Sequence, residues 1–357
     1  MTRLEPDLIF DGETLRKGVV EIEEGRVVAI GQGRGDRVPG ILTPGFVDLQ
    51  VNGGGDVLLN TSPTVAGMEA IAAAHRRFGT VGILPTVITD APGVLDAVTE
   101  AALAARGRPG ILGLHIEGPH ISTARRGTHK AEFVRPLDAR TLTAVARLRA
   151  GGVPILLTLA PEAVRPGQVA ELVAMGAVVS IGHSDATADE VRALLAEGAR
   201  CFTHLFNAMS PMLNRSEGVT GACINSSAYA GIICDGIHVA DAMVGLALRA
   251  RPVADTTFLV SDAMPTVGGS DRFTLYGNEI HVENGRLVNA EGSLAGAHVT
   301  MAQSLKRLIE VVGLAPEAAL RMATTIPSRV MGLPEGIIGQ RASDLILLDA
   351  SWQVQEL

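Results

Sequence analysis

Residues 155–205 read ILLTLAPEAVRPGQVAELVAMGAVVSIGHSDATADEVRALLAEGARCFTHL, and they alternate between two patterns. Continuous apolar runs occupy 155–159, 177–181 and 201–205, whereas apolar residues recur at helical spacing in 167–175 and 187–197. Continuous apolar runs are typical of parallel strands covered on both faces, and helices usually connect such strands. The stretch therefore predicts a β-α-β-α-β unit of a parallel sheet.

The same alternation extends through most of the chain. Further apolar runs lie at 46–50, 83–87, 111–116, 231–234 and 257–261, which makes eight in total. Further segments of helical spacing lie at 65–78, 93–106, 140–150, 240–250 and 298–312. Eight strands alternating with helices predict a (β/α)8 barrel. An open doubly wound sheet is the alternative, but the turn VNGGGD at 51–56 lacks the GxGxxG pattern of a dinucleotide site.

Both ends of the chain have strand patterns. Residues 19–23 and 26–30 form a hairpin pattern across Glu24 and Gly25, and 344–348 is another apolar run. We expect these segments to pair in one small β module. A β insertion is expected at 273–289, between the eighth strand and its helix, because Asn284-Gly285 is a strong hairpin signal.

The composition narrows the possible partners and compartments. The chain has 357 residues and a formal net charge of −8, which argues against nucleic acid or a membrane surface as the main partner. No apolar run approaches the ~20 residues of a membrane span, and the first residues lack the pattern of a signal peptide. The three cysteines are too few and too irregularly spaced for a disulfide framework. We therefore expect a cytoplasmic protein.

Polar residues gather where the predicted strands end. In chain order they are Gln50 and Asn52, Thr86, Glu117, Glu162, His183 to Asp185, His204, Asp235 to His238, and Ser261 with Asp262. The carboxyl ends of all barrel strands meet at one mouth, where the active sites of such barrels lie. Each residue alone could cap the next helix, but the recurrence at eight ends favours a functional site.

The chemistry at these ends points to a metal. Glu117, His183 and His204 make an open set of one carboxylate and two imidazoles, which is known from catalytic zinc sites that keep a position for water. Asp262 is a candidate general base toward a water on the metal. Spacing alone leaves open whether the two histidines are ligands or structural residues.

A co-linear series of motifs makes the chain recognisable. In order they are PGFVDLQVNG (44–53), HIEGP (115–119), GTH (127–129), GHS (182–184), HLFNAM (204–209), DGIHV (235–239), SDAM (261–264) and LAG (294–296). Together they closely resemble the N-acetylglucosamine-6-phosphate deacetylase family of the amidohydrolase superfamily, over about residues 40 to 345. The resemblance implies a metal-bearing barrel at 43–335 and a small β-sandwich domain built from 1–42 and 336–357.

The resemblance also implies roles for individual residues. Glu117, His183 and His204 match the metal ligands, while Asp262 matches the catalytic aspartate and His129 the histidine that contacts the acetyl carbonyl. The positions that match substrate contacts are Thr128, His129, Asn207, Ala208, Arg215, Asp235, His238, Leu294, Ala295 and Gly296. The phosphate is expected near Arg215, which in this family of dimers reaches toward the neighbouring subunit's site, so we expect a homodimer with a shared active site.

The implied reaction removes the acetyl group from N-acetylglucosamine 6-phosphate and gives glucosamine 6-phosphate and acetate. We expect one divalent metal ion, zinc in preference to other transition metals. Many amidohydrolases hold a second metal with His-x-His after the first strand, where this chain has Gln50 and Asn52, which are poor zinc ligands. The fourth strand is followed by no lysine that could become a carbamylated bridge.

Two departures from the family pattern and two alternative functions remain open. Ser216-Glu217 follows Arg215 where Glu-Pro is common, and His120 stands where an aromatic residue is frequent. The first leaves open the geometry of the sugar-phosphate contacts, and the second leaves open the shape of the pocket. One alternative is a deacetylase of N-acetylgalactosamine 6-phosphate or another N-acyl amine. The other is a non-catalytic amidohydrolase-like scaffold, which the intact ligands and Asp262 disfavour.

Overall fold

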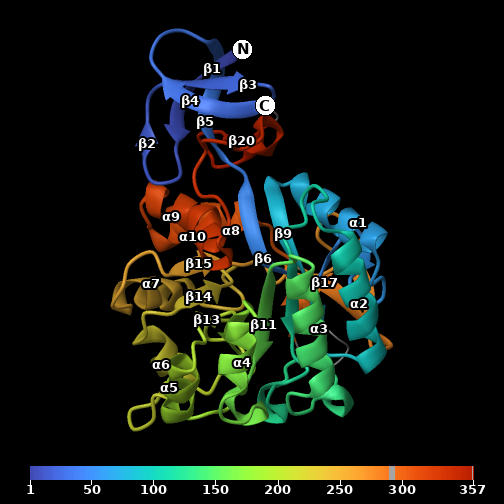
Figure 1. Cartoon of the computed structure of the whole chain (residues 1–357). Coiled ribbons are helices and arrows are strands. Elements are labelled where there is room, and N and C mark those ends of the chain that lie inside the picture. Colours follow the sequence, from blue (N-terminus) through green and yellow to red (C-terminus); the bar gives the residue numbers. More distant parts are fainter. Residues whose placement is uncertain (289–293, 356) are drawn as a thin grey trace.

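Eight parallel strands form one sheet in the computed structural model of the chain, which describes residues 1–288, 294–355 and 357 (Figure 1). In spatial order they are β6 (Phe46–Val51), β9 (Thr80–Ile88), β10 (Leu114–Glu117), β11 (Ile155–Leu159), β12 (Val178–Ile181), β13 (Cys201–Phe202), β14 (Tyr229–Ile232) and β15 (Thr257–Leu259). Two backbone hydrogen bonds join the ends of the first and last strands, from Asp262 to Gln50 at 3.0 Å and from Asn52 to Ala263 at 2.9 Å. The sheet thus forms the predicted (β/α)8 barrel.

A helix follows each barrel strand. These helices are α1 (Val65–Arg76), α2 (Pro92–Ala104), α3 (Ala139–Ala150), α4 (Gln168–Ala174), α5 (Ala188–Ala196), α6 (Gly218–Ile224), α7 (Asp241–Ala250) and α8 (Met301–Arg307). Side chains of Thr64, Asp138, Thr187 and Thr300 cap four of them by accepting a backbone N–H of the first turn. None of the helices in the described part of the chain is both long and apolar enough to cross a membrane.

Three short helices were not predicted, namely α6, α9 (Pro316–Ala323) and α10 (Thr325–Met331). A fourth helix, α8, is shorter than predicted. Figure 1 shows α8, α9 and α10 between the barrel and the small domain. The segment predicted as one helix over 298–312 ends its α-helical part at Arg307 and continues as a π-helical turn over Leu308–Val312.

Both ends of the chain contribute to one seven-stranded sheet, as predicted. Its strands are β1 (Thr2–Phe10), β2 (Leu15–Arg16), β3 (Val19–Glu23), β4 (Arg26–Gly31), β5 (Asp36–Pro44), β20 (Leu345–Leu348) and β21 (Val354–Gln355). The C-terminal β20 pairs antiparallel with β5, with Leu345 opposite Pro44. Buried Ile9, Val20, Leu42 and Leu347 form its core. The domain boundaries after residues 42 and 335 stay a prediction.

The β insertion lies where it was predicted, between β15 and α8, but it is larger than one hairpin. It forms a four-stranded antiparallel sheet from β16 (Arg272–Leu275), β17 (Asn278–Glu283), β18 (Arg286–Val288) and β19 (Leu294–Ala297). Positive φ angles at Tyr276 and Gly277 make a second tight turn besides the one at Asn284 and Gly285. Residue 289 lies outside the described residues. A short ribbon of β7 (Gly53–Gly54) and β8 (Val57–Leu58) follows β6.

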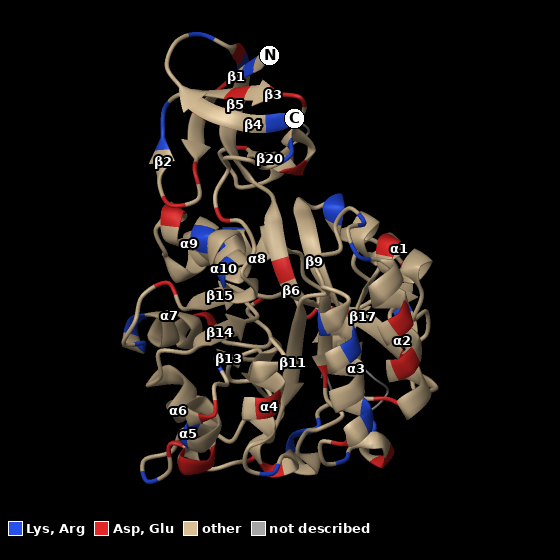
Figure 2. Ribbon diagram, viewed as in Figure 1, with Lys and Arg blue, Asp and Glu red and all other residues tan. Residues whose placement is uncertain are grey.

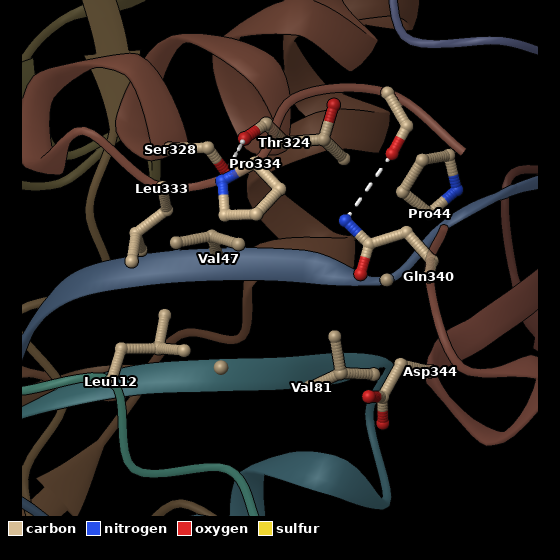
Figure 3. A pocket seen from close by; sticks show the side chains of 13 residues that line it. Pro44, Val47, Val81, Leu112, Thr324, Ser328, Leu333, Pro334, Gln340 and Asp344 are labelled. Carbon is tan, nitrogen blue, oxygen red and sulfur yellow. Dashed lines mark hydrogen bonds between the residues drawn. The ribbon is translucent and has the colours of Figure 1, made fainter. Parts of the chain in front are cut away.

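Charged residues are unevenly distributed over the barrel, and a cavity lies at each end of it. Charged residues lie mostly on the outer helices and loops (Figure 2), and those within the barrel strands are Asp48 of β6 and Glu117 of β10. At the amino ends of the strands, a cavity of about 130 Å³ lies between the first barrel strands and the segment after α10 (Figure 3). Its Ser328 and Gln340 side chains already donate to the Thr324 and Gly336 carbonyls. A second pocket, which is lined by the histidines and carboxylates of the predicted site, lies at the carboxyl ends of the strands.

Candidate metal centre and active site

A pocket of about 210 Å³ lies at the carboxyl ends of the barrel strands. It is lined by Asn52, Ile88, Glu117, Gly127, Thr128, His129, His183, His204, Asn207, Ala208, His238, Asp262, Met264 and Gly296. These residues follow or end strands β6, β9, β10, β12, β13, β14 and β15, so the expected convergence at one mouth is observed.

Three side chains in this pocket aim their ligand atoms at one another. Nε2 of His183 and Nε2 of His204 each lie 3.1 Å from Oε1 of Glu117, and the two nitrogens lie 3.0 Å apart. All three side chains are buried. Four-coordinate zinc with bonds of about 2.0–2.1 Å holds its ligand atoms about 3.3 Å apart, which is close to this spacing. The donor set therefore fits a divalent metal.

Neighbouring groups orient two of the three ligands. Nδ1 of His183 lies 2.9 Å from the carbonyl oxygen of Arg125, and because a carbonyl only accepts, Nδ1 carries the proton. In the neutral ring this leaves the lone pair on Nε2 directed at Glu117. Nδ1 of His204 is buried and has no partner among the described residues. The amide of Gln50 donates to Oε1 of Glu117 at 3.0 Å.

The charges of the site perturb two of the ligands in opposite directions. Burial raises the pKa of Glu117, but the neighbouring imidazoles outweigh burial and hold the pKa well below its usual range. Burial lowers the pKa of His204, but the Glu117 carboxylate outweighs burial and raises it. Without a metal, Glu117 and His204 thus favour a carboxylate–imidazolium pair, whose proton a metal ion must displace.

Asp262 lies across the pocket and is held by two amides. Nδ2 of Asn52 donates to its Oδ1 at 2.7 Å, and Nε2 of Gln50 approaches the same oxygen at 3.2 Å. Burial, together with the nearby Glu117 carboxylate, raises the pKa of Asp262 to about 6. A carboxylate with a pKa in this range can both accept and return a proton near neutral pH.

The backbone at three of these residues has an uncommon conformation. His183, His204 and Asp262 have φ angles of +48°, +33° and +52°. Each such position costs about 1–3 kcal/mol for a non-glycine residue, and such strain clusters at functional sites. Each of the three residues follows the end of a barrel strand, where the turn directs its side chain over the mouth of the barrel.

His129 lies on the loop after β10 and faces the metal-ligand cluster. Its ring centroid is 4.4 Å from that of His183. Burial, and then the charge of His183, lower the pKa of His129 to about 3, so the ring is neutral. Its Nδ1 lies 2.7 Å from Oγ1 of Thr89, while no described residue forms a hydrogen bond with Nε2. The neutral ring therefore has one nitrogen free for a ligand in the pocket.

His238 forms a second polar centre on the pocket wall. Its Nδ1 donates to Oδ2 of Asp235 at 2.6 Å, and Oδ1 of Asp235 accepts the backbone N–H groups of Ile237 and His238 at 2.8 Å each. Burial raises the pKa of Asp235, but His238 and the two backbone N–H groups together outweigh burial and lower it. Asp235 thus supports His238 from behind and does not itself line the pocket.

Only some of the remaining predicted substrate residues line the pocket. Thr128, Asn207, Ala208 and Gly296 line the pocket, while Ala295 is buried beside it in the insertion's core. The side chain of Leu294 lies outside the described residues. Arg215 is exposed on the loop after β13 and does not line the pocket of its own chain. The shared-site arrangement therefore stays a prediction.

Two residues that the sequence places at strand ends beside the mouth, Thr86 and Glu162, lie elsewhere. β9 continues to Ile88, so Thr86 lies inside the barrel, where it accepts the N–H of Val51, and Thr89 is the residue at the mouth. Glu162 accepts hydrogen bonds from Ser184 and Asp185 and supports that loop from outside. A count of two residues past the apolar run would have found Thr89.

The two departures from the family pattern lie outside the pocket lining. His120 is buried, with its ring nitrogens 2.8 Å from the Thr141 hydroxyl and 3.1 Å from the Arg135 carbonyl. Ser216 and Glu217 are exposed, and Glu217 pairs with Arg192 at 3.2 Å.

Comparisons with known proteins show the family of the chain. The model of the amidohydrolase family matches residues 41–354. N-acetylgalactosamine-6-phosphate deacetylase of Shewanella sp. is 38% identical over 88% of this chain and 81% of its own, and N-acetylglucosamine-6-phosphate deacetylase of Haemophilus influenzae is 34% identical over 82% and 78%. The crystal structure of N-acetylglucosamine-6-phosphate deacetylase from Pasteurella multocida superposes with a TM-score of 0.92 at 29% identity, covering 99% of this chain and 96% of that one.

Proposed function

The chain belongs to the amidohydrolase family, and we propose that it hydrolyses the acetamide of N-acetylglucosamine 6-phosphate to glucosamine 6-phosphate and acetate. The observation that carries this proposal is the convergence of Glu117, His183 and His204 opposite Asp262 in one pocket. The similar proteins are named as deacetylases of N-acetylated hexosamine 6-phosphates and match most of the chain, which supports this class of substrate.

One divalent ion, zinc in preference to others, fits the donor set of Glu117, His183 and His204. Two imidazole nitrogens and one carboxylate oxygen are ligands that zinc accepts readily. The positions that hold a second metal in many amidohydrolases bear Gln50 and Asn52, whose amides donate to Glu117 and Asp262. These side chains could bind a metal only through their neutral carbonyl oxygens, which are weak ligands for zinc, so a single ion is favoured.

The chain's own residues divide the proton transfers of the reaction. When bound, the ion would supply Lewis-acid polarisation and make a water more acidic. Asp262 accepts a proton from the water that attacks the acetyl carbonyl and returns it to the leaving amine. His129, through its free Nε2, donates a hydrogen bond to the carbonyl oxygen as negative charge develops there, which is worth about 3 kcal/mol for one good donor.

Recognition of the phosphate needs positive charge from beyond the described lining of the pocket. Neither lysine nor arginine is among the described residues that line it. We therefore propose that Arg215 of a neighbouring subunit completes the site in a homodimer. A mixture of Arg215→Ala and Asp262→Asn chains tests this arrangement. If sites are shared, mixed dimers regain part of the activity that each variant lacks, whereas unshared sites regain none.

Acetate release from a panel of sugars tests the function. The panel comprises N-acetylglucosamine and N-acetylgalactosamine, each with and without the 6-phosphate. We expect the 6-phosphates to react much faster, and Asp262→Asn should keep the metal and lose most turnover. Equal rates on the unphosphorylated sugars would contradict phosphate recognition. A protein that neither binds zinc nor releases acetate would favour the non-catalytic scaffold.

Activity on N-acetylgalactosamine 6-phosphate is the second candidate function. The relative from Shewanella sp., at 38% identity, carries that name. The two sugars differ at one ring hydroxyl, so the metal centre and Asp262 would serve both. The ratio of kcat/KM for the two 6-phosphates decides between them.

The cytoplasm is the compartment we propose for this reaction. Cys201, Cys223 and Cys234 are all free and buried, which fits a reducing compartment.

A further inference from the structure

Thr89 touches the histidine that faces the metal-ligand cluster. It follows the last residue of β9, and its Oγ1 lies 2.7 Å from Nδ1 of His129. Both side chains are buried. We propose that Thr89 is a positioning residue whose hydroxyl donates to Nδ1 of His129 and so keeps the ring proton on Nε2, at the pocket side. The proposal rests on the function proposed above, in which His129 contacts the acetyl oxygen.

The direction of this hydrogen bond follows from the surroundings of Thr89. If Nδ1 of His129 carried the proton and donated to Oγ1, the hydroxyl proton of Thr89 would need another acceptor. Among the described residues, Oγ1 of Thr89 has no hydrogen-bond partner other than His129. A buried donor without an acceptor is costly, whereas a hydroxyl oxygen whose lone pairs lack a donor costs less. Donation from Thr89 to Nδ1 is therefore the favoured arrangement.

Two contacts hold Thr89 in place for this role. The hydroxyl of Tyr276, from the turn between β16 and β17 of the inserted sheet, donates to the backbone carbonyl of Thr89. On the other side, Gly118 has a φ of +77°, and a Cβ at Gly118 would overlap Oγ1 of Thr89. The inserted sheet thus holds the backbone of Thr89, and the turn after β10 packs against its hydroxyl.

The tautomer decides what His129 offers a substrate. With the proton on Nε2, the ring donates to an oxygen that gains negative charge, such as the carbonyl oxygen of an amide under attack. With the proton on Nδ1, Nε2 would present a lone pair to the same oxygen and repel it. Thr89 would therefore act on the chemical step more than on substrate binding.

Two variants at Thr89 and one distant control separate this role from packing. Thr89→Val keeps the shape and removes the hydroxyl, while Thr89→Ser keeps the hydroxyl. Thr99→Val is the control, because Thr99 is a buried threonine on α2 whose hydroxyl donates to Leu95 at 2.7 Å, outside the pocket lining. Each protein is loaded with zinc, and its melting temperature is measured to confirm folding.

The decisive measurement is the ring tautomer of His129. Two-bond ¹H–¹⁵N correlation spectra of ¹⁵N-histidine-labelled protein report it, with His129→Gln identifying the signals. We expect the Nε2–H form in the wild type, Thr89→Ser and Thr99→Val, and a shift toward Nδ1–H in Thr89→Val. In Thr89→Val, kcat should fall about 10- to 100-fold, the range seen for outer partners of functional histidines, with KM within about twofold.

Several results would overturn the proposal. They are an Nδ1–H tautomer in the wild type, an unchanged tautomer in Thr89→Val, or full kcat in that variant. The spectra need no substrate, so they decide the role of Thr89 even if no sugar in the panel releases acetate. If the wild type releases no acetate from any sugar in the panel, this result counts against the proposed function and not against the role of Thr89.

Discussion

Asn52 holds Asp262 in place: the amide nitrogen of Asn52 lies 2.7 Å from Oδ1 of Asp262. The bond joins the residue after β6 to the residue beyond β15, so it also spans the seam where the barrel closes. An amide that donates to a carboxylate favours its charged form. Asn52 therefore lowers the pKa of Asp262 against the raising effects of burial and of Glu117.

Replacing Asn52 by leucine should shift the pH profile of the enzyme. Leucine has a similar volume and cannot donate, so the pKa of Asp262 should rise above its value of about 6. A general base works when it is ionised, so activity is lost as pH falls through this pKa. We expect the acidic limb of kcat to move to higher pH by about one to two units, since one hydrogen bond to a charged group contributes about 1.5–3 kcal/mol and one pKa unit corresponds to about 1.4 kcal/mol.

The measurement is kcat against pH for acetate release, with Asn60→Leu as the matched control. Asn60 is also buried and donates to a carboxylate, that of Asp90 at 2.9 Å, but it does not line the pocket. A profile of Asn52→Leu that coincides with the wild type would show that Asn52 does not tune Asp262.

Removal of one ligand should abolish metal binding. The wild type should hold about one ion per chain, and His183→Asn should lose most of it, because two of three ligands bind weakly. Affinity should rise with pH, because the proton that Glu117 favours on His204 must leave when the metal binds. Elemental analysis after dialysis and chelator competition at pH 6 and pH 8 measure both effects.

His281→Asn is the control for the metal experiment, because His281 lies on β17 and outside the pocket lining. A stoichiometry near two in the wild type would contradict the single-metal interpretation. Stronger binding at pH 6 than at pH 8 would contradict the assigned proton release.

The sequence predicted which residues gather at the mouth, but it did not predict how they are oriented. Glu117, His183 and His204 could be chosen because chain order places their strands β10, β12 and β13 close together in a parallel barrel, with only β11 between them. The left-handed backbone of His183 and His204 has no signal in residue type, since neither position is glycine. The sequence also misplaces the end of β9, because an apolar run does not show where a strand leaves the barrel. It therefore predicts Thr86, and not Thr89, as the residue at the mouth.

Long-range contacts account for what else the sequence did not predict. Helix α6 contains two glycines in seven residues and has no helical signal of its own, so its burial against neighbouring elements determines it. The second turn of the insertion, at Tyr276 and Gly277, lacks the Asn-Gly pair that indicated the first. The position of Arg215 relative to a neighbouring pocket depends on a second chain, which the pattern of one chain does not contain.

Gly236→Ala should weaken substrate binding through the turn that carries His238. Gly236 has a φ of +73°, and a Cβ there would overlap the guanidinium of Arg307, which is held by Asp241 at 2.6 and 2.7 Å. The turn or the ion pair must move, and the Asp235–His238 pair moves with the turn. We expect KM for the 6-phosphate substrate to rise about tenfold, equivalent to about 1.4 kcal/mol, with a smaller change in kcat.

Gly313→Ala isolates the backbone effect from the overlap. Gly313 has a φ of +81°, and a Cβ there would meet no atom within 4 Å. Both variants should lose about 1 kcal/mol of stability from the strained backbone, but only Gly236→Ala should raise KM. Equal KM values in the two variants would show that the overlap with Arg307 does not affect substrate binding.

Asp48 should make the stability of the protein depend on pH. It lies in β6 with no exposed surface, and its Oδ1 accepts the N–H groups of Gln50 and Ser261 at 3.2 Å each. Burial raises the pKa of Asp48 from its usual 3.8 to about 7. The folded state thus holds this proton more tightly than the unfolded chain, so the stabilisation is complete below about pH 4 and is lost as pH rises toward 7.

The Asp48→Asn variant removes this titration and keeps a neutral, similarly shaped side chain. A shift of about three pKa units corresponds to a change on the order of 4 kcal/mol in the free energy of unfolding. The wild type should therefore lose stability relative to Asp48→Asn by roughly that amount between pH 4 and pH 8. Urea unfolding of both proteins at intervals across this range measures the difference, in which the titration of all other groups cancels. Parallel curves would show that Asp48 has the same pKa in the folded and unfolded states, and that the barrel interior stabilises its charge.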